Sequence, residues 1–449
     1  MTTAHPQPGP RDGEFAPAHG SYEGTGGPDA SGDSERYGGP GGYGGPAPMF
    51  GPAFTGLDRA ELYRRLRAEH GPVAPVTLLG DVPAWLVLGY RELHDITGDP
   101  ELFTRDSAIW NRWDDIPQDW PLMPMLGRQP SILYEDGDRH RRRSELVGDT
   151  LGAVDPFELR ELSEQLADRL IDGFCGRGRA DLIAEYTRPL PALVLSRLYG
   201  FADEQAASLA ADINSLVDGD ADALRSSQRL RRAMGELLRS RAIAPAADVA
   251  SRMQQHANSA EFSAPELLED LVANIIVGQQ PTADWMGNSL RLMLTDDRFS
   301  ESLAGGRNSI AEAMNEVLWE ETPTQNMAGR WATRDTVLGG RGIRRGDLLV
   351  LSFAGANADP RVRPDQSAFT GGNSAFLSFG HGEHRCPYPA QEIAEGIART
   401  GIEVLLDRLP DVDLDVPREE LVWRASPWLR GLESLPVAFS PAPARDGRR

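Results

Sequence analysis

The stretch Phe379-Gly380-His381-Gly382-Glu383-His384-Arg385-Cys386-Pro387 decides how this 449-residue chain is interpreted. Its glycines permit backbone angles that other residues avoid, and they let the main chain approach a flat ligand closely. A cysteine thiolate at the end of such a loop is one of the standard protein ligands of haem iron. Apolar residues from Ile393 to Leu406 then recur at helical spacing. We therefore expect Cys386 at or just before a helix N-terminus, where the helix dipole stabilises a negative sulfur.

Two other interpretations of this cysteine stay open at this point. A single cysteine is more often a small buried hydrophobic residue than a metal ligand. Zinc is the second alternative, because His381, His384 and Cys386 are clustered and all three are potential ligands. The other cysteine, Cys175, lies far away in the sequence, and no CxxC pair closes a structural zinc site.

The composition is that of an acidic globular protein, with 40% hydrophobic residues, 25% charged residues and a formal net charge of -21. A nucleic acid is not expected as the main partner, because phosphate binding needs a basic surface. No apolar run is long enough for a membrane span, and the N-terminus does not resemble a secretion signal. Two cysteines cannot make a disulfide framework. We therefore expect a cytoplasmic protein. All 46 basic side chains are arginine, which we attribute to a GC-rich genome.

Three regions differ in composition along the chain. Residues 1–50 are rich in Gly and Pro and are predicted to be a disordered tail, because they cannot bury enough apolar surface. Residues 51–440 carry the periodic patterns of one folded domain, and residues 441–449 are predicted to be a flexible C-terminus. The periodicity predicts helices near residues 57–70, 159–170, 190–198 and 230–238, and strands near 73–79, 85–88 and 337–351.

The cysteine stretch resembles the haem-binding loop of cytochromes P450, which runs Phe-Gly-x-Gly-x-His-x-Cys-x-Gly. Every position up to Cys386 matches, whereas the last glycine is replaced by Tyr388, which Pro389 follows. The resemblance covers about residues 52–440 and includes segments 195–200, 330–335 and 356–360. It implies a mostly α fold with small β-sheets, in which a triangular-prism helical domain is joined to a β-rich portion.

The resemblance also implies a haem b cofactor with the thiolate of Cys386 as its axial iron ligand. Phe379 and Gly380 would belong to the loop that holds the haem. His140, Arg330 and His384 occupy the positions that bind the haem propionates in this family.

A helix on the opposite, distal side of the haem is predicted to start at the capping box Ser263-Ala264-Pro265-Glu266. Its centre in the family reads Ala-Gly-x-Glu-Thr-Thr, where the acid and the first threonine manage proton delivery to oxygen. Here the segment reads Val277-Gly278-Gln279-Gln280-Pro281-Thr282. The usual proton relay is therefore absent, unless Thr282, substrate or water replaces it. Pro281 is also expected to kink or widen the helix.

A further departure concerns Glu316-Val317-Leu318-Trp319, where the family has Glu-x-x-Arg. Glu316 is predicted to be protonated or to find another donor, such as the indole of Trp319 or a nearby arginine. Together with the segments around it, this pattern resembles the divergent P450s of actinobacterial conservon operons. Those operons also encode a sensor-kinase-like protein and a small GTPase, so conservon signalling proteins are implied as partners.

The leading hypothesis is a haem-thiolate oxidoreductase of the monooxygenase type that acts on a small organic substrate. Its electrons would come from a ferredoxin-type donor that docks near Cys386. The substrate is expected between the distal helix and residues 212–227, with residues 103–126 lining its pocket. Gln280 and Pro281 motivate two alternatives: a haem-binding regulatory or interaction protein with little monooxygenase activity, and a peroxide-using haem enzyme.

Overall fold

The computed structural model describes residues 46–51, 54, 59–296, 299, 308–364 and 373–445. The chain divides into the units Met1–Gly45 and Pro46–Arg449, and only the second is described below. Most of the predicted disordered tail and the last four residues therefore lie outside the described residues. The folded unit begins a few residues before the predicted boundary at residue 51, because Ala47 and Pro48 form a strand and Met49 is buried. Near the other end, Ala442 donates its N–H to the carbonyl of Cys175.

One mixed sheet has the strand order β1-β2-β3-β9-β6-β4. Its strands are β1 (Ala47–Pro48), β2 (Val73–Leu78), β3 (Val82–Val87), β4 (Phe103–Thr104), β6 (Asn326–Ala332) and β9 (Leu348–Ser352). β3 pairs in parallel with β9, with Trp85 opposite Leu349. The strands predicted near residues 73–79 and 85–88 thus share one sheet with the end of the predicted stretch 337–351, whereas the rest of that stretch forms β7 and β8 outside this sheet. Two smaller sheets contain β5 (Arg179–Asp181), β10 (Asp413–Leu414) and β11 (Pro436–Ala438), and β7 (Thr336–Leu338) and β8 (Arg341–Ile343).

Helices make up most of the remaining described chain. They are α2 (Arg59–His70), α3 (Tyr90–Gly98), α4 (Met123–Leu126), α5 (Gly137–Gly152), α6 (Pro156–Asp172), α7 (Pro189–Tyr199), α8 (Asp203–Asp218), α9 (Ala223–Ile243), α10 (Val249–Gln255), α11 (Ala264–Thr295), α13 (Asn308–Glu320), α14 (Phe353–Asn357) and α15 (Tyr388–Arg408). Short helices include η3 (Ile132–Tyr134) and the π-helix η5 (Ile183–Thr187). The predicted helices near residues 57–70, 159–170, 190–198 and 230–238 correspond to α2, α6, α7 and α9.

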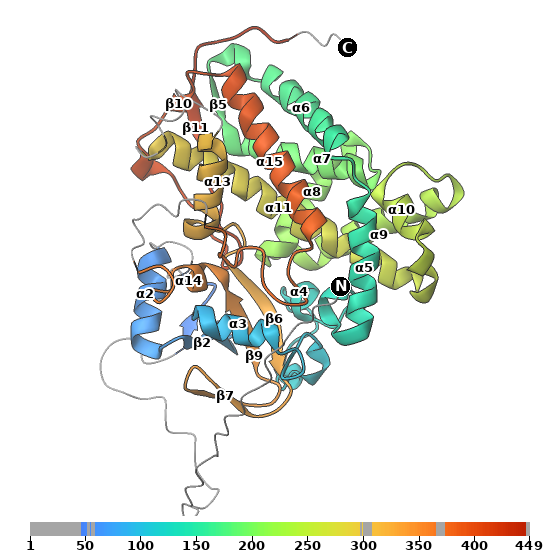
Figure 1. The fold of residues 1–449 in the computed structure, drawn as a ribbon, viewed down its shortest axis with the longest axis vertical. Helices are drawn as coiled ribbons and strands as arrows, with labels where there is room; N and C mark the ends of the chain where they lie inside the picture. The colour runs from blue at the N-terminus through green and yellow to red at the C-terminus, as the bar shows by residue number, and fades with distance from the viewer. Residues whose placement is uncertain are drawn as a thin grey trace, which may run out of the picture. The chain divides into compact units, whose positions relative to one another are not determined.

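The arrangement of α11 and α15 positions the site. α15 packs against α6 and α11, and α11 also contacts α7 and α13 (Figure 1). The predicted capping box begins α11, because the Glu266 carboxylate accepts a 2.8 Å hydrogen bond from the Ser263 N–H. α11 continues as helix through Pro281, so this proline does not end it. The predicted kink at Pro281 remains a prediction.

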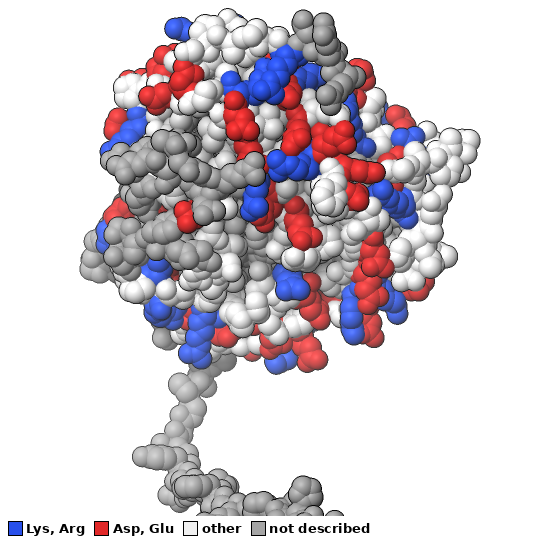
Figure 2. All heavy atoms as spheres, turned by 45° about the horizontal axis from the view of Figure 1, so that its top comes forward, with Lys and Arg blue, Asp and Glu red and all other residues white. Residues whose placement is uncertain are grey.

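The charge distribution on the surface and the polarity of the helices agree with the globular composition of the sequence. Figure 2 shows acidic and basic side chains interleaved on the face in view, with neither sign gathered into a patch of its own. Within the described residues, none of the helices combines the length and the apolar character that crossing a bilayer would need.

Candidate active site

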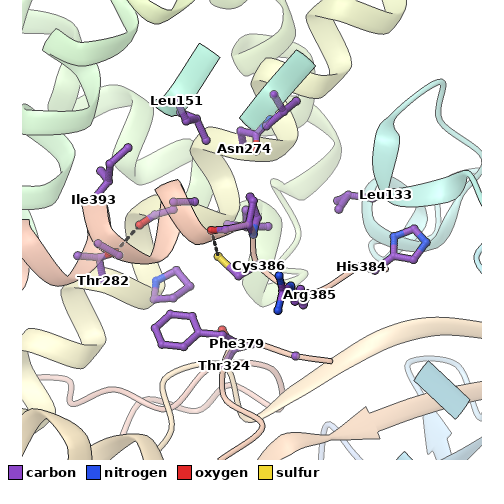
Figure 3. Close-up of a pocket in the computed structure, with 18 of the residues that line it drawn as sticks. Leu133, Leu151, Asn274, Thr282, Thr324, Phe379, His384, Arg385, Cys386 and Ile393 are labelled. Carbon is purple, nitrogen blue, oxygen red and sulfur yellow. Dashed lines mark hydrogen bonds between the residues drawn. The ribbon is translucent and has the colours of Figure 1, made fainter. Parts of the chain in front are cut away.

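A cavity of about 210 Å³ lies between α11 and the cysteine loop. Gly278, Pro281 and Thr282 of α11 form one wall, and Phe379 and Cys386 lie on another. In Figure 3 the side chains of Thr282, Phe379 and Cys386 project toward the same space. Two motifs about a hundred residues apart in the sequence therefore meet at one cavity.

Local backbone geometry fixes the cysteine loop. The Cys386 N–H donates to the carbonyl of Phe379 at 2.8 Å, and α15 begins two residues later, as predicted. Gly380 and Gly382 both have φ of +74°, and a Cβ on Gly382 would lie 2.0 Å from the carbonyl oxygen of Thr97. Burial raises the pKa of the Cys386 thiol to about 12. A thiolate at this position therefore needs a strong positive partner, which a bound metal ion supplies.

The zinc interpretation finds no support in the geometry. The His381 ring stacks on His94 with 3.8 Å between the ring centroids, whereas His384 stacks on His140 at 3.9 Å. His384 also places its Nε2 3.2 Å from a carboxylate oxygen of Asp136. In the part of the chain that the structure describes, no three His, Cys, Asp or Glu side chains are grouped as metal ligands.

The structure brings the three predicted propionate-binding residues together. His140 of α5 and His384 line one end of the cavity, and Arg330 of β6 is buried beside them. Sequence reasoning missed Arg105, which lines the same end and donates to the carbonyls of Leu133 (2.6 Å) and Gly329 (2.8 Å). Arg105 directly follows β4, and the pairing of β4 with β6 brings it near Arg330. No short motif could have shown that pairing.

This cluster of two arginines and two histidines, Arg105, His140, Arg330 and His384, presents N–H donors that suit negatively charged groups. Burial, with Arg105 nearby, lowers the pKa of Arg330 well below its usual value, and burial lowers the pKa of His140 to about 4. Burial alone would raise the pKa of Asp136, but hydrogen bonds from His384 and Thr104 outweigh it and lower that pKa to about 2. The Asp136 carboxylate is thus already hydrogen-bonded to His384 and Thr104. Additional carboxylates, such as two propionates, would find donors here.

Of the three predicted distal residues, two line the cavity and one does not. Pro281 and Thr282 line the cavity, and the Thr282 hydroxyl donates to the carbonyl of Gly278 at 2.6 Å. Gln280 is buried away from the cavity wall, and its side-chain amide donates to Asp284 at 2.8 Å. Burial raises the pKa of Asp284. Sequence reasoning missed Asp284, although its position four residues after Gln280 places both on one helix face.

The two regions that were predicted to border the substrate, residues 103–126 and 212–227, lie almost entirely outside the lining of this cavity. From residues 103–126, only Arg105 lines the cavity, because Trp110 and Trp120 are buried against each other and Trp110 also packs against Trp331. Residues 212–227 contribute no lining side chain to this cavity. Arg229 instead ties this region together through ion pairs with Asp212 and Asp222, both at 2.6 Å. The expected lining by these two regions is therefore wrong for this cavity.

The structure identifies a partner for Glu316. Its buried carboxylate lies 2.6 Å from the guanidinium of Arg363, which also contacts Glu320 at 3.0 Å. The Trp319 indole donates instead to the carbonyl of Asn373 at 2.7 Å. Of the predicted alternatives, the nearby arginine is confirmed as a partner.

Proteins named as cytochromes P450 are similar to this chain over most of its length. No protein-family model matches the chain. The chain is 29% identical over 370 residues to the polyketide biosynthesis cytochrome P450 PksS of Bacillus subtilis, with 80% of this chain and 89% of PksS covered. It is also 29% identical over 390 residues to the vitamin D(3) 25-hydroxylase of Pseudonocardia autotrophica, covering 85% and 94%.

The fold is similar to solved P450 structures. CYP154C4 from a Streptomyces species superposes with a TM-score of 0.79 at 25% identity, covering 88% of this chain and 97% of that one. The structure of PksS superposes with a TM-score of 0.76 at 27% identity, covering 87% and 99%. With a cysteine loop facing a long helix and P450s matching over most of its length, the chain belongs to the cytochrome P450 superfamily of oxidoreductases.

Proposed function

We propose that this protein is a haem-thiolate oxidoreductase of the monooxygenase type that acts on a small organic substrate. One observation carries the proposal: the Cys386 side chain lines a cavity whose other wall is Pro281 and Thr282 of α11. Haem b would occupy the space between these walls, with Cys386 as the axial ligand of its iron. When bound, such a haem supplies thiolate-supported cleavage of the O–O bond.

The residues around the cavity fit this cofactor. Phe379 and Gly380 would pack against the haem on the cysteine side, where the positive φ of Gly380 lets the loop turn. The same cluster would hold the propionates, because Arg105 and Arg330 supply positive charge and all four side chains supply N–H donors, while Asp136 and Glu383 are the carboxylates that already act on Arg330. Leu151, Ile393 and Ile397 exclude water from the interior of the cavity.

On the wall that α11 forms, the hydroxyl of Thr282 can take part in proton transfer. Thr282 donates its own proton to the carbonyl of Gly278, which leaves its oxygen able to accept a hydrogen bond from a molecule in the cavity. Gln280 cannot titrate and faces Asp284, and Pro281 has neither a hydroxyl nor an amide proton. Proton delivery through the usual pair of side chains is therefore not available.

The substrate and partners belong to the same proposal. Similar proteins are named as hydroxylases and as a polyketide biosynthesis P450, which supports a small organic substrate. A ferredoxin-type protein would supply electrons in the cytoplasm, and docking near Cys386 would give the shortest path to the iron. A structure similar to this one holds P450BioI with an acyl carrier protein, so a P450 of this fold can accept a protein partner. Conservon signalling proteins remain proposed partners through the Glu316-x-x-Trp319 pattern.

The position of Gln280 favours a second candidate function. Because its amide is bonded to Asp284 away from the cavity, the chain could bind haem and have little oxygen-dependent turnover. Such a protein would act in regulation or interaction, or would use peroxide, which brings its own O–O bond and protons.

The deciding experiment is the absorption spectrum of the purified protein, reduced with dithionite and mixed with carbon monoxide. A red-shifted band typical of thiolate ligation is expected. A band at the shorter wavelength of histidine-ligated or inactivated haem would reject Cys386 thiolate as the ligand, and absence of haem would overturn both candidate functions. Turnover with a reduced ferredoxin, compared with hydrogen peroxide, then separates the oxygenase from the peroxide-using enzyme.

A further inference from the structure

A second cavity of about 260 Å³ lies at the start of α2 and the end of α13. It shares no lining residue with the haem cavity. Arg59 and Tyr63 of α2 form one side, Trp319 lies on another, and Thr322 and Gln325 follow α13. Nothing in the proposed haem chemistry uses these side chains.

Four of these side chains are more than nine-tenths buried and carry polar atoms without a hydrogen-bond partner. The exposed fraction is 6% for Arg59 and 1% for both Tyr63 and Thr322, while Gln325 is 0% exposed. In the described structure, geometric hydrogen-bond partners are missing for Nε and Nη1 of Arg59, the hydroxyls of Tyr63 and Thr322, and Oε1 of Gln325. The Tyr63 hydroxyl interacts with the Arg59 guanidinium without forming a hydrogen bond of normal geometry. Each unsatisfied buried polar group is unfavourable, because it has lost its hydrogen bonds to water without gaining others. Their gathering around one cavity indicates that the cavity holds a polar ligand.

The charged side chains around the cavity indicate the sign of the charge on that ligand. Arg430 lies 2.7 Å from Glu321, and Arg363 contacts Glu320 at 3.0 Å, so these lining arginines already face carboxylates. Arg59 has no carboxylate within 4.0 Å among the described residues, and its Nη2 donates to the Ser426 carbonyl at 3.2 Å. Glu321 attracts the Arg59 guanidinium from beyond that distance, but burial outweighs this attraction and lowers the pKa of Arg59. Burial of a guanidinium without a closer counter-charge is unfavourable. The two glutamates disfavour a highly charged ligand and favour one that carries a single charge.

We propose that this cavity binds a small oxyanion, a carboxylate or a monoanionic phosphate group, through the unpartnered Nε and Nη1 of Arg59. These two atoms lie on different edges of the guanidinium, so each donates a single charge-assisted hydrogen bond to the ligand or to a water beside it. The hydroxyls of Tyr63 and Thr322 donate to the remaining oxygens. Oε1 of Gln325 accepts from a protonated phosphate oxygen or from a water that accompanies a carboxylate. The site is separate from the haem and independent of the proposed oxidoreductase function.

The test uses the full-length, haem-loaded protein with sodium acetate and inorganic phosphate as separate probes, each followed by titration calorimetry and by tryptophan fluorescence. We expect saturable binding of one anion per chain. Arg59→Met should weaken it by about 10- to 100-fold, the range expected for lost hydrogen bonds to a charged group. Arg64→Gln is the matched control, because Arg64 lies on the same helix with a side chain that is 69% exposed, and it should bind like the wild type.

Each outcome has a defined meaning. Binding of phosphate but not acetate identifies a phosphate group as the ligand, and the reverse identifies a carboxylate. If Arg59→Met does not fold, Tyr63→Phe removes a single hydroxyl and should weaken binding several-fold. Absence of saturable binding with both probes, or equal affinity in the wild type and the folded variants, would overturn the proposal. The carbon monoxide spectrum should be the same in all variants, so failure of this site is distinguishable from failure of the haem site.

Discussion

The two walls of the cavity that we propose for haem differ in how they depart from the P450 pattern. On the cysteine side, the loop ends in Cys386 as expected, and Glu316 faces a cation even though the expected arginine is Trp319. On the α11 side, the acid and the first hydroxyl of the pattern are replaced by Gln280 and Pro281.

The difference shows that the cation of a buried ion pair can be supplied by another segment of the chain, whereas a group that delivers protons cannot be moved in this way. A buried carboxylate needs a cation within reach, and Arg363 supplies one to Glu316 from a segment that follows α14. Proton delivery needs a titratable group at one particular place beside the reacting atoms. Asp284 lies four residues beyond the position that the acid occupies in the pattern, so it does not restore that arrangement.

The largest expected effect comes from the cysteine side. Cys386→Ser should abolish the red-shifted carbon monoxide band, because a serine hydroxyl does not replace a thiolate at iron. Cys175→Ser is the matched control, since Cys175 is the other cysteine of the chain and is buried in the hydrophobic core away from the cavity. That variant should keep the band. If Cys386→Ser retained it, the assignment of the iron ligand would be wrong.

Arg363→Met tests the transferred ion pair. Removing the guanidinium that lies 2.6 Å from the buried Glu316 should lower the free energy of unfolding by about 3–5 kcal/mol. Arg225→Met breaks an exposed ion pair with Asp222 and should cost less than about 1 kcal/mol. Urea unfolding of both variants provides the measurement. Equal costs would show that Arg363 contributes no more than a surface arginine.

The α11 side can be tested by restoring the missing relay. Combining Gln280→Glu with Asp284→Asn exchanges the acid and the amide while keeping one negative charge, and Pro281→Thr adds the hydroxyl. Oxygen-dependent oxidation of a probe substrate should rise by about 10²-fold, since positioned proton transfer contributes about 10²–10⁴ in rate. Pro281→Thr alone is the control. An unchanged rate would favour the haem-binding protein with little turnover.

Arg330→Leu separates haem binding from fold stability. The variant should lose haem about 10- to 100-fold more readily, because charge-assisted bonds to a propionate disappear. The haem-free protein should not be destabilised, since Arg330 is buried beside Arg105, a like charge. Arg334→Leu, at an exposed position nearby, should change neither property. A marked loss of stability in haem-free Arg330→Leu would indicate a structural role instead.

The smallest expected effect concerns pH and a second carboxylate of α11. Burial raises the pKa of Asp270 to about 6, although Arg143 opposes the shift. Because the folded pKa is raised, the contribution of Asp270 to stability is present below about pH 4 and is lost as pH rises through 6. Relative to Asp270→Asn, the wild type should lose at most roughly 3 kcal/mol over this range.

Urea unfolding between pH 4 and pH 7 checks this prediction. Asp138→Asn is the control, because the Asp138 side chain is 82% exposed and should give the wild-type slope. On the cysteine side, Asp136 has a pKa lowered to about 2, so its contribution changes only at more acidic pH. If Asp270→Asn also followed the wild-type slope, burial of Asp270 would not govern its ionisation.

The sequence by itself determined the features that depend on neighbouring residues. The start of α11 follows from Ser263 and Glu266, and the start of α15 from the helical spacing after Cys386. The loop of Gly380 and Gly382 follows from residues that tolerate a positive φ. These features require contacts only within a turn or two of the chain, so a local pattern is sufficient to predict them.

Only the tertiary structure decided which distant segments meet. It joined β3 to β9 in one sheet, placed Arg105 beside Arg330, and gave Glu316 the guanidinium of Arg363. It also turned Gln280 toward Asp284 and buried the tryptophans that were expected to line a pocket. The physical reason is that burial and charge pairing depend on how whole elements pack. The sequence contains many residues of a suitable type, and a local pattern does not show which of them will meet.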